Sequence, residues 1–311
     1  MIAIPHKAKQ FLVLLIKLLI VGGAFYFIYN QLAHNDQLDW ALFLEKFEKN
    51  KSVSGIAFII LLSFLNRFFE ILKWQNLVAT IQKITVAEAS KQVLGALTAG
   101  LFTPNGIGEY AGKALFFNKK ETKNIIFLNL ICNGIQMVLS IIFGTIGLWI
   151  LGYRFWVLII VLIGFGLWIF SSLSKKITIK GYSIQKLADK INAVPKQIHR
   201  KNIVLGICRY LVFSHQYYFL FLAFDVDLPY WTMISTIAAV YFLASSLPTF
   251  QFLDFAVKGG VGVYFFGVLG VNEWIVVFIS TLMWLLNVVI PVIIGSYYVL
   301  NFKSRPVAPD H

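Results

Sequence analysis

The sequence predicts an all-α fold: a polytopic membrane helical bundle with two re-entrant hairpins arranged as inverted repeats. Hydrophobic residues make up 59% of the 311 residues, whereas charged residues make up only 13%. Because a soluble domain carries about 25% charged residues, this composition cannot cover a soluble core with polar surface. The lengths of the apolar runs, and the breaks in two of them, define the rest of the predicted fold.

Six apolar runs are long enough to cross a bilayer, which takes roughly 20 residues in a helix. They are Phe11–Tyr29, Gly55–Leu77, Asn124–Leu151, Phe155–Leu173, Ile203–Phe224 and Ile275–Leu300. Basic residues precede the first run, as in a signal peptide, but no clean small-residue cleavage site follows it. We therefore expect the first run to be retained as a helix.

Two more apolar runs, Ala87–Phe117 and Trp231–Phe266, are broken near the middle by Pro or Gly. Backbone groups freed within the hydrocarbon are tolerated only where protein or a wet cavity covers them. Each broken run is therefore expected to enter and leave on one side of the membrane as a re-entrant hairpin.

The formal net charge of +13 is concentrated in short segments between the apolar runs. Since Lys and Arg collect on the cytoplasmic side of membrane proteins, these segments predict the orientation. They place both termini in the cytoplasm, together with Lys119–Lys123 and Lys175–Lys201, whereas the acidic Asp225 and Asp227 face outward. The distribution favours attraction to an anionic leaflet and argues against nucleic acid as a partner.

The segment between the two halves carries an apolar stripe at three- and four-residue steps. Its members are Ile184, Leu187, Ile191 and Val194, with Lys186 and Lys190 off the stripe. This pattern predicts a short amphipathic helix, either on the inner leaflet or packed on the cytoplasmic ends of the bundle. We expect one integral membrane domain, residues 1–311, in which a cytoplasmic linker spans about 174–202.

The two broken runs resemble each other. After a Pro-bearing break, each contains an acid, an aromatic residue, an alanine, any residue and a lysine, as Glu109–Lys113 and Asp254–Lys258. Upstream, Arg67 parallels Arg209. The helices after the two motifs run in opposite directions if the basic segments are cytoplasmic, so units of about 54–151 and 203–300 are predicted to be inverted repeats, as in many transporters.

Ionisable residues inside a membrane are costly and face the protein interior, which makes them candidates for function. The candidate substrate-binding residues are Arg67, Lys73, Thr103, Pro104, Asn105, Gly106, Gly108, Glu109, Lys113, Arg209, Asp254 and Lys258. An acid four residues before a lysine also favours a helical ion pair, so each hairpin could neutralise itself. Glu70 lies one turn from both Arg67 and Lys73, and His215 is expected to be a hydrogen-bonded core residue.

The stretch Thr103–Gly108 combines a helix-terminating proline with two glycines. A half-helix starting near Gly108 would direct its positive end and its free N–H groups at one point, which suits a phosphate or carboxylate. The alternative is a tight turn that only reverses the hairpin. The sequence contains no metal-ligand spacing, nucleotide-binding motif or catalytic triad pattern, so we expect no cofactor and no conventional enzyme.

These residues resemble the transmembrane region of the lysylphosphatidylglycerol synthase and flippase-like family. The resemblance rests on the stretches Asn66–Trp74 and Thr103–Glu109, the latter similar to the family's Pro-x-Gly-x-Gly-Glu loop. It implies a multi-pass protein of the bacterial inner membrane that binds or flips a phospholipid or related polar lipid. Lysyl transfer is not expected, because the chain ends about ten residues after its last span. The second hairpin, Pro248–Asp254, departs from the family pattern.

The expected partners are membrane lipids with an anionic phospholipid-like headgroup, bound in a midplane cavity between the repeats. Arg67, Lys73, Lys113 and Lys258 would attract the headgroup, while Glu109 and Asp254 would hold the lysines or contact a cationic headgroup. One alternative is a membrane enzyme that modifies a lipid carrier, with one of these acids as base. Another is a structural subunit of an envelope-assembly complex or a homo-oligomer, and an ion-coupled transporter also fits the paired charges.

Overall fold

A computed structural model describes residues 52–302, except 102, 104–105, 175–177, 180–181 and 248–250, and also the single residues 11, 15 and 45. The predicted first span, Phe11–Tyr29, therefore lies outside the described residues apart from Phe11 and Leu15. Both chain termini, which the sequence places in the cytoplasm, also lie outside them.

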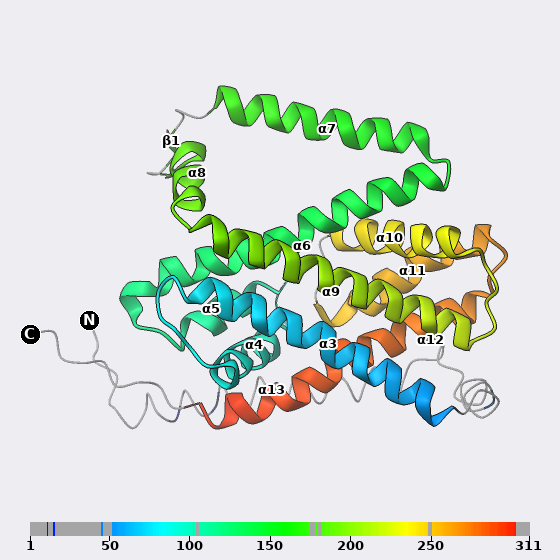
Figure 1. Cartoon of the computed structure of the whole chain (residues 1–311), viewed down its shortest axis with the longest axis horizontal. Helices are drawn as coiled ribbons and strands as arrows, with labels where there is room; N and C mark the ends of the chain where they lie inside the picture. Colours follow the sequence, from blue (N-terminus) through cyan, green and yellow to red (C-terminus); the bar gives the residue numbers. More distant parts are fainter. Residues whose placement is uncertain are drawn as a thin grey trace, which may run out of the picture.

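The described chain is almost entirely helical, in agreement with the predicted class (Figure 1). The helices of the first half are α3 (Val53–Val78), α4 (Val86–Gly100), α5 (Ile107–Ala114), the 3₁₀ turn η1 (Lys119–Glu121), α6 (Thr122–Ile150) and α7 (Arg154–Leu173). Two short strands, β1 (Thr178–Ile179) and β2 (Tyr182–Ser183), pair antiparallel before α8 (Ile184–Asn192). The second half contains α9 (Lys196–Ala223), α10 (Tyr230–Ser246), the turn η2 (Gln251–Leu253), α11 (Asp254–Val268), α12 (Glu273–Trp284), the π-helical turn η3 (Leu285–Val289) and α13 (Ile290–Leu300).

Four of the described helices are long and apolar enough to cross a membrane. They are α3, the continuous segment Lys119–Ile150, α7, and the segment Glu273–Leu300 that joins α12 to α13. Helix α9 (the predicted span Ile203–Phe224) has the length of a span but is not among them, because Arg209, His215 and Gln216 interrupt its apolar sequence. The chain is therefore a membrane protein, and α9 buries one polar face, which includes Asn202, Ser214 and Gln216, against the rest of the bundle.

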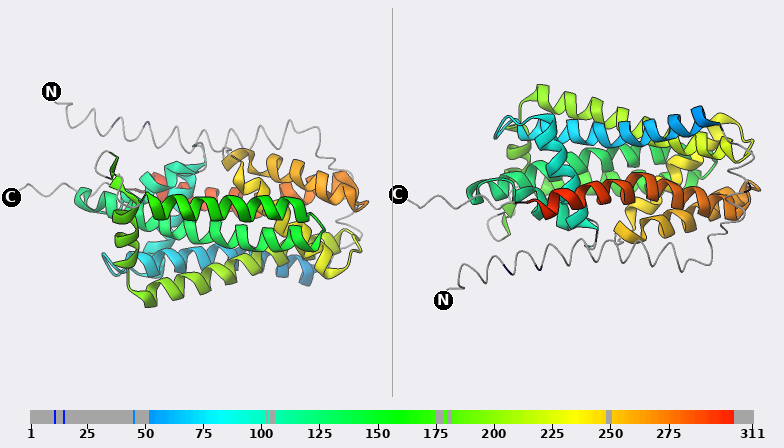
Figure 2. Two further views of the ribbon diagram at one scale, coloured as in Figure 1. Left: turned by 90° about the horizontal axis from the view of Figure 1, so that it is seen from above. Right: turned by 90° about the horizontal axis from the view of Figure 1, so that it is seen from below.

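Four pairs of helices pack extensively in the described bundle: α3 lies along α9, α6 along α10, α11 along α12, and α4 along α13 (Figure 2). Glycines bring two of these pairs into close contact. A Cβ at Gly147 of α6 would lie 2.5 Å from the Ser235 carbonyl oxygen of α10, and one at Gly295 of α13 would lie 2.2 Å from the Leu94 carbonyl oxygen of α4. Small residues at such crossings let membrane helices approach closely.

The two broken runs are interrupted where the sequence predicts. Helix α4 ends at Gly100 and α5 begins at Ile107, while α10 ends at Ser246 and α11 begins at Asp254. In Figure 1, α4 and α5 occupy one half of the length of the bundle, and α10 and α11 occupy the other half. Both breaks consequently fall near its middle.

The predicted amphipathic helix is present as α8, which runs across the ends of the long helices rather than along them (Figure 1). Two residues of its apolar stripe, Leu187 and Ile191, are exposed. On another face, the Lys190 ammonium lies 4.6 Å from the centroid of the Phe127 ring in α6. Helix α8 therefore packs on the end of the bundle and also presents an apolar surface outward, so it combines features of both predicted arrangements.

Candidate functional site

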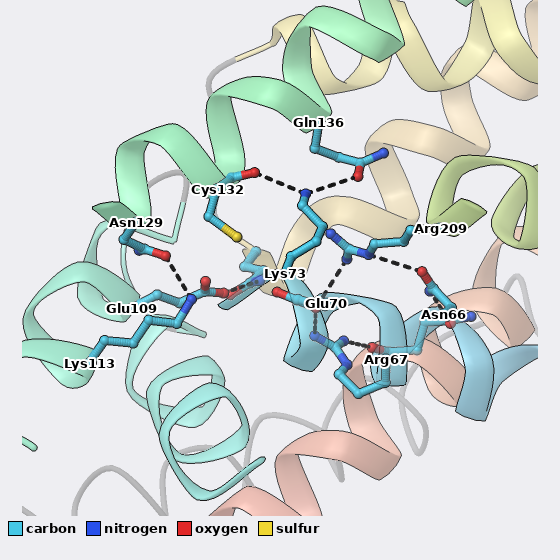
Figure 3. A network of polar contacts seen from close by, with 12 residues as sticks. Asn66, Arg67, Glu70, Lys73, Glu109, Lys113, Asn129, Cys132, Gln136 and Arg209 are labelled. Atoms are coloured by element: carbon cyan, nitrogen blue, oxygen red, sulfur yellow. Dashed lines mark hydrogen bonds and ion pairs between the residues drawn. The ribbon is translucent and has the colours of Figure 1, made fainter. Parts of the chain in front are cut away.

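A cluster of buried charged side chains lies between α3 and α9 at the centre of the bundle (Figure 3). Glu70 of α3 accepts a hydrogen bond from Arg67, one turn earlier in the same helix, which confirms this predicted pair. The same carboxylate pairs with Arg209 of α9, whose Nη2 atom lies 3.2 Å from Glu70 Oε2. The two arginines that the sequence aligns between its halves therefore converge on one acid.

The π-helical turn η3 links this cluster to the last span. Arg67 donates to the backbone oxygen of Asn287, at the centre of the turn. Asn66 Nδ2 donates to Asn287 Oδ1 at 2.7 Å, and Asn66 Oδ1 accepts from Arg209 Nε at 3.1 Å. A π-helical turn interrupts regular helical hydrogen bonding and occurs frequently at functional sites. Here it supplies an acceptor for a buried guanidinium.

Lys73 belongs to the same helix face but does not pair with Glu70. Its Nζ atom donates to the Cys132 backbone oxygen at 3.0 Å and to Gln136 Oε1 at 3.4 Å, both in α6. The side chain is fully buried, with 0% exposure. A Cβ at Gly206 of α9 would lie 3.0 Å from Leu139 Cδ1, so glycine there allows α9 to pack closely against α6 beside Lys73. Although Lys73 lies one helical turn from Glu70, its ammonium therefore bonds to α6 and not to the Glu70 carboxylate.

The predicted ion pair between Glu109 and Lys113 is wrong. Both residues are described, and no nitrogen–oxygen distance of 4.0 Å or less joins their charged groups in that part of the chain. Lys113 Nζ instead donates to Asn129 Oδ1 in α6 at 2.7 Å and lies 4.7 Å from the ring centroid of Trp74. Glu109 Oε1 accepts from Gln251 Nε2 at 3.1 Å. Because both side chains lie on the buried face of α5, against other parts of the bundle, each charged group bonds to a partner outside its own helix.

The glycines around this break have steric roles. A Cβ at Gly100 would lie 2.6 Å from Glu109 Cγ, so only glycine lets this side chain fold back over the end of α4. Gly106 has φ +67°, a left-handed conformation that favours glycine. Gly108 N donates to Thr103 Oγ1 at 2.7 Å, which satisfies that amide within the turn. The predicted residues Pro104 and Asn105 lie outside the described residues.

The second hairpin contains the ion pair that the first one lacks. Lys258 Nζ lies 2.6 Å from Asp254 Oδ2, which confirms the predicted pair. The ammonium also lies 5.0 Å from the ring centroid of Tyr241 and 5.5 Å from that of Phe213. Aromatic faces stabilise a cation at such distances. This hairpin is therefore locally neutral, although its residue Gln251 reaches across to the first one.

His215 forms hydrogen bonds, as expected, but lies away from the core. Its Nδ1 atom is 2.8 Å from the Leu211 backbone oxygen and its Nε2 atom is 2.9 Å from the Tyr230 hydroxyl. The side chain is only partly buried. It does not contact the central cluster.

Several amide side chains of the site were not among the residues that the sequence singled out as candidates. They are Asn129, Gln136, Gln251 and Asn287. Each is an isolated polar residue within or beside an apolar segment, and that isolation is the signal that could have identified them.

Comparison of the chain with family models, curated proteins and solved structures finds no match.

Proposed function

We propose that this chain is a lipid-translocating membrane protein whose central cluster attracts an anionic headgroup. The observation that carries the proposal concerns Lys73 and Lys113. Both are 0% exposed, and the hydrogen-bond acceptors within reach of each ammonium are neutral carbonyl and amide oxygens. A cation inside a membrane protein that has no bonded counter-charge is expensive, and such positions are typical of substrate pathways.

The cluster as a whole also contains more cations than acids. Its cations are Arg67, Lys73, Lys113 and Arg209, and its acids are Glu70 and Glu109. Four cations and two acids leave two positive charges in excess when all are ionised. The Asp254–Lys258 pair adds no net charge. A phosphodiester or carboxylate would offset this excess, which supports an anionic phospholipid-like ligand over a cationic one.

The proposal includes two inverted repeats, about residues 54–151 and 203–300, with each broken run forming a re-entrant hairpin. Reciprocal packing supports it: α4 of the first unit lies along α13 of the second, and α10 of the second lies along α6 of the first. The tips of the two hairpins meet through the hydrogen bond between Gln251 and Glu109. Meeting of broken helices near the midplane is a common basis for alternating access in transporters.

The distribution of charge supports cytoplasmic termini in a bacterial inner membrane. One end of the bundle in Figure 1 gathers the starts of α4, α6 and α9 with the ends of α3, α7 and α13. Basic residues in and beside these segments are Lys83, Lys119, Lys120, Lys123, Lys196, Arg200 and Lys201. The opposite end holds Asp225, Asp227 and Glu273, with Arg154 as a basic residue among them. A positive-inside bias favours the first end as cytoplasmic.

A proteoliposome assay tests the function directly. The purified protein is reconstituted with fluorescent phosphatidylglycerol, and dithionite then destroys the fluorophore in the outer leaflet only. Translocation makes the protected fraction accessible as well. We expect the unaltered protein to translocate this lipid, and Lys113→Met, Arg67→Ala and Glu109→Ala to slow it. Lys83→Met serves as the matched control, because Lys83 is exposed at the end of the bundle.

Two results would contradict the proposal at different levels. Unchanged translocation in all three site variants would remove these residues from the substrate path. Failure of the unaltered, correctly folded protein to move any phospholipid would refute the function itself. Each variant is first compared with the unaltered protein by gel filtration and thermal unfolding in detergent, so that a slow rate is not mistaken for loss of fold.

A further inference from the structure

A recess of about 390 Å³ lies at the end of the bundle proposed to be cytoplasmic. It is formed by the start of α4, the residues that follow α5, and the end of α13. The lining residues are Glu88, Lys91, Gln92, Leu115, Phe116, Tyr297, Tyr298, Asn301 and Phe302. Aromatic rings that line a polar recess at this level match the composition of membrane–water interfaces.

Gln92 contributes an amide side chain to the wall of the recess. Its side chain is 5% exposed, and its Oε1 atom accepts from Trp74 Nε1 at 2.7 Å. Because an indole N–H can only donate, this bond fixes which end of the amide faces Trp74. The NH₂ group is therefore directed away from Trp74. Lys91, one residue earlier, adds an exposed ammonium to the same recess.

Gln92 and Trp74 connect the recess to the central cluster. Trp74 lies behind Gln92, and the ammonium of Lys113 lies 4.7 Å from the Trp74 ring centroid. Trp74 itself is 0% exposed. Gln92 in the recess therefore contacts Trp74, and Trp74 in turn contacts the buried ammonium of Lys113.

We propose that this recess is the docking site where an anionic phospholipid of the cytoplasmic leaflet binds before its headgroup reaches Lys113. Lys91 and the Gln92 amide donate to the phosphate, while the aromatic rings and Leu115 contact the glycerol and the first acyl carbons. The Gln92–Trp74 pair forms the barrier between docking and the buried cluster. Glu88 also lines the recess, where its carboxylate accepts from Thr85 N at 2.8 Å and caps α4, so the phosphate is expected on the side of Lys91 and Gln92. The inference rests on the proposed function and specifies its loading step.

Photo-crosslinking locates the bound lipid. The full chain is reconstituted in vesicles that contain a phosphatidylglycerol analogue with a photoreactive group near the glycerol, and labelled peptides are identified by mass spectrometry. Gln92→Glu is the informative variant, because a carboxylate keeps the acceptor for Trp74, removes the NH₂ donor and adds a negative charge that repels the phosphate. Lys91→Met removes the ammonium, and Lys83→Met is the control. Loss of one charge-assisted hydrogen bond should weaken labelling about tenfold.

The expected result is labelling of peptides around Leu115 and Tyr298 that Gln92→Glu and Lys91→Met reduce and Lys83→Met does not. Equal labelling by a phosphatidylcholine analogue, displacement by millimolar inorganic phosphate, or labelling no stronger than that of α7 would overturn the docking site. Dithionite assays on the same vesicles separate the two proposals. Translocation that persists after labelling is lost would place the recess off the route and leave the function standing. Recess labelling without translocation in the unaltered protein would refute the function.

Discussion

Replacement of Glu70 by glutamine tests whether its carboxylate, which two arginines share, stabilises the central cluster. The Glu70 carboxylate is 5% exposed and is shared by Arg67 and Arg209. A glutamine side chain at this position would keep one oxygen acceptor, but its NH₂ group would face a guanidinium that can only donate. Removal of one partner from a buried ion pair costs about 3–5 kcal/mol. We therefore expect the free energy of unfolding to fall by about that amount.

The measurement is unfolding by titration of SDS into detergent micelles, followed by tryptophan fluorescence. Glu273→Gln is the matched control, since Glu273 is exposed in the first turn of α12 and its loss should cost at most about 1 kcal/mol. Adding Arg209→Gln to the Glu70 variant should recover part of the loss, because it removes one of the two stranded cations. A Glu70 variant as stable as the control would show that the shared carboxylate does not stabilise the cluster.

Three further predictions use the same titration. Gly295→Ala should destabilise the protein by about 1–3 kcal/mol, because its Cβ would lie 2.2 Å from a carbonyl oxygen of α4. The control is Gly164→Ala, whose Cβ would have nothing within 4 Å, so that this variant should be neutral or stabilise by up to about 1 kcal/mol. Asp254→Asn should cost about 3 kcal/mol by stranding the Lys258 ammonium, and Lys258→Met in the same chain should recover most of the loss, which a double-mutant cycle measures. Gln251→Leu should cost about 1.5–3 kcal/mol, because it removes the donor to the α5 carboxylate; a loss equal to that of Leu substitution at an exposed site would disprove this coupling.

Much of the fold is predictable because the membrane imposes simple rules on sequence. Runs of about 20 apolar residues predict spans, and Pro or Gly within such a run predicts a break. The predicted Gly55–Leu77 and Phe155–Leu173 correspond closely to α3 and α7. The start of α4 is also encoded locally, since Thr85 and Glu88 form a capping box. These features depend on neighbours in the chain, so the sequence alone suffices to identify them.

The partners of buried charges were less predictable, because they depend on which helices meet. The spacing of Glu109 and Lys113 favours a pair on an isolated helix. In the bundle, α5 is wedged between α4 and α6, and Asn129 of α6 is nearer to the ammonium than Glu109 is. Arg209 and Glu70 are 139 positions apart in the chain, and only the packing of α9 on α3 brings them together. No local pattern could indicate that contact.

The two broken runs share a sequence motif, but the acid and the lysine of the motif have different partners in each. This difference bears on where a ligand would bind. Lys258 keeps its acid four residues away and lies against aromatic rings, so the second hairpin is neutral without a ligand. Lys113 pairs with an amide in place of its acid, while Glu109 has turned to the opposite hairpin. A symmetric pair of hairpins would have balanced both sides. The excess of positive charge therefore lies in the cluster formed by α3, α5 and α9, and Lys113 is the member of that cluster that lies against Trp74. If an anion binds as proposed, Lys113 is the first cation that it meets from the recess.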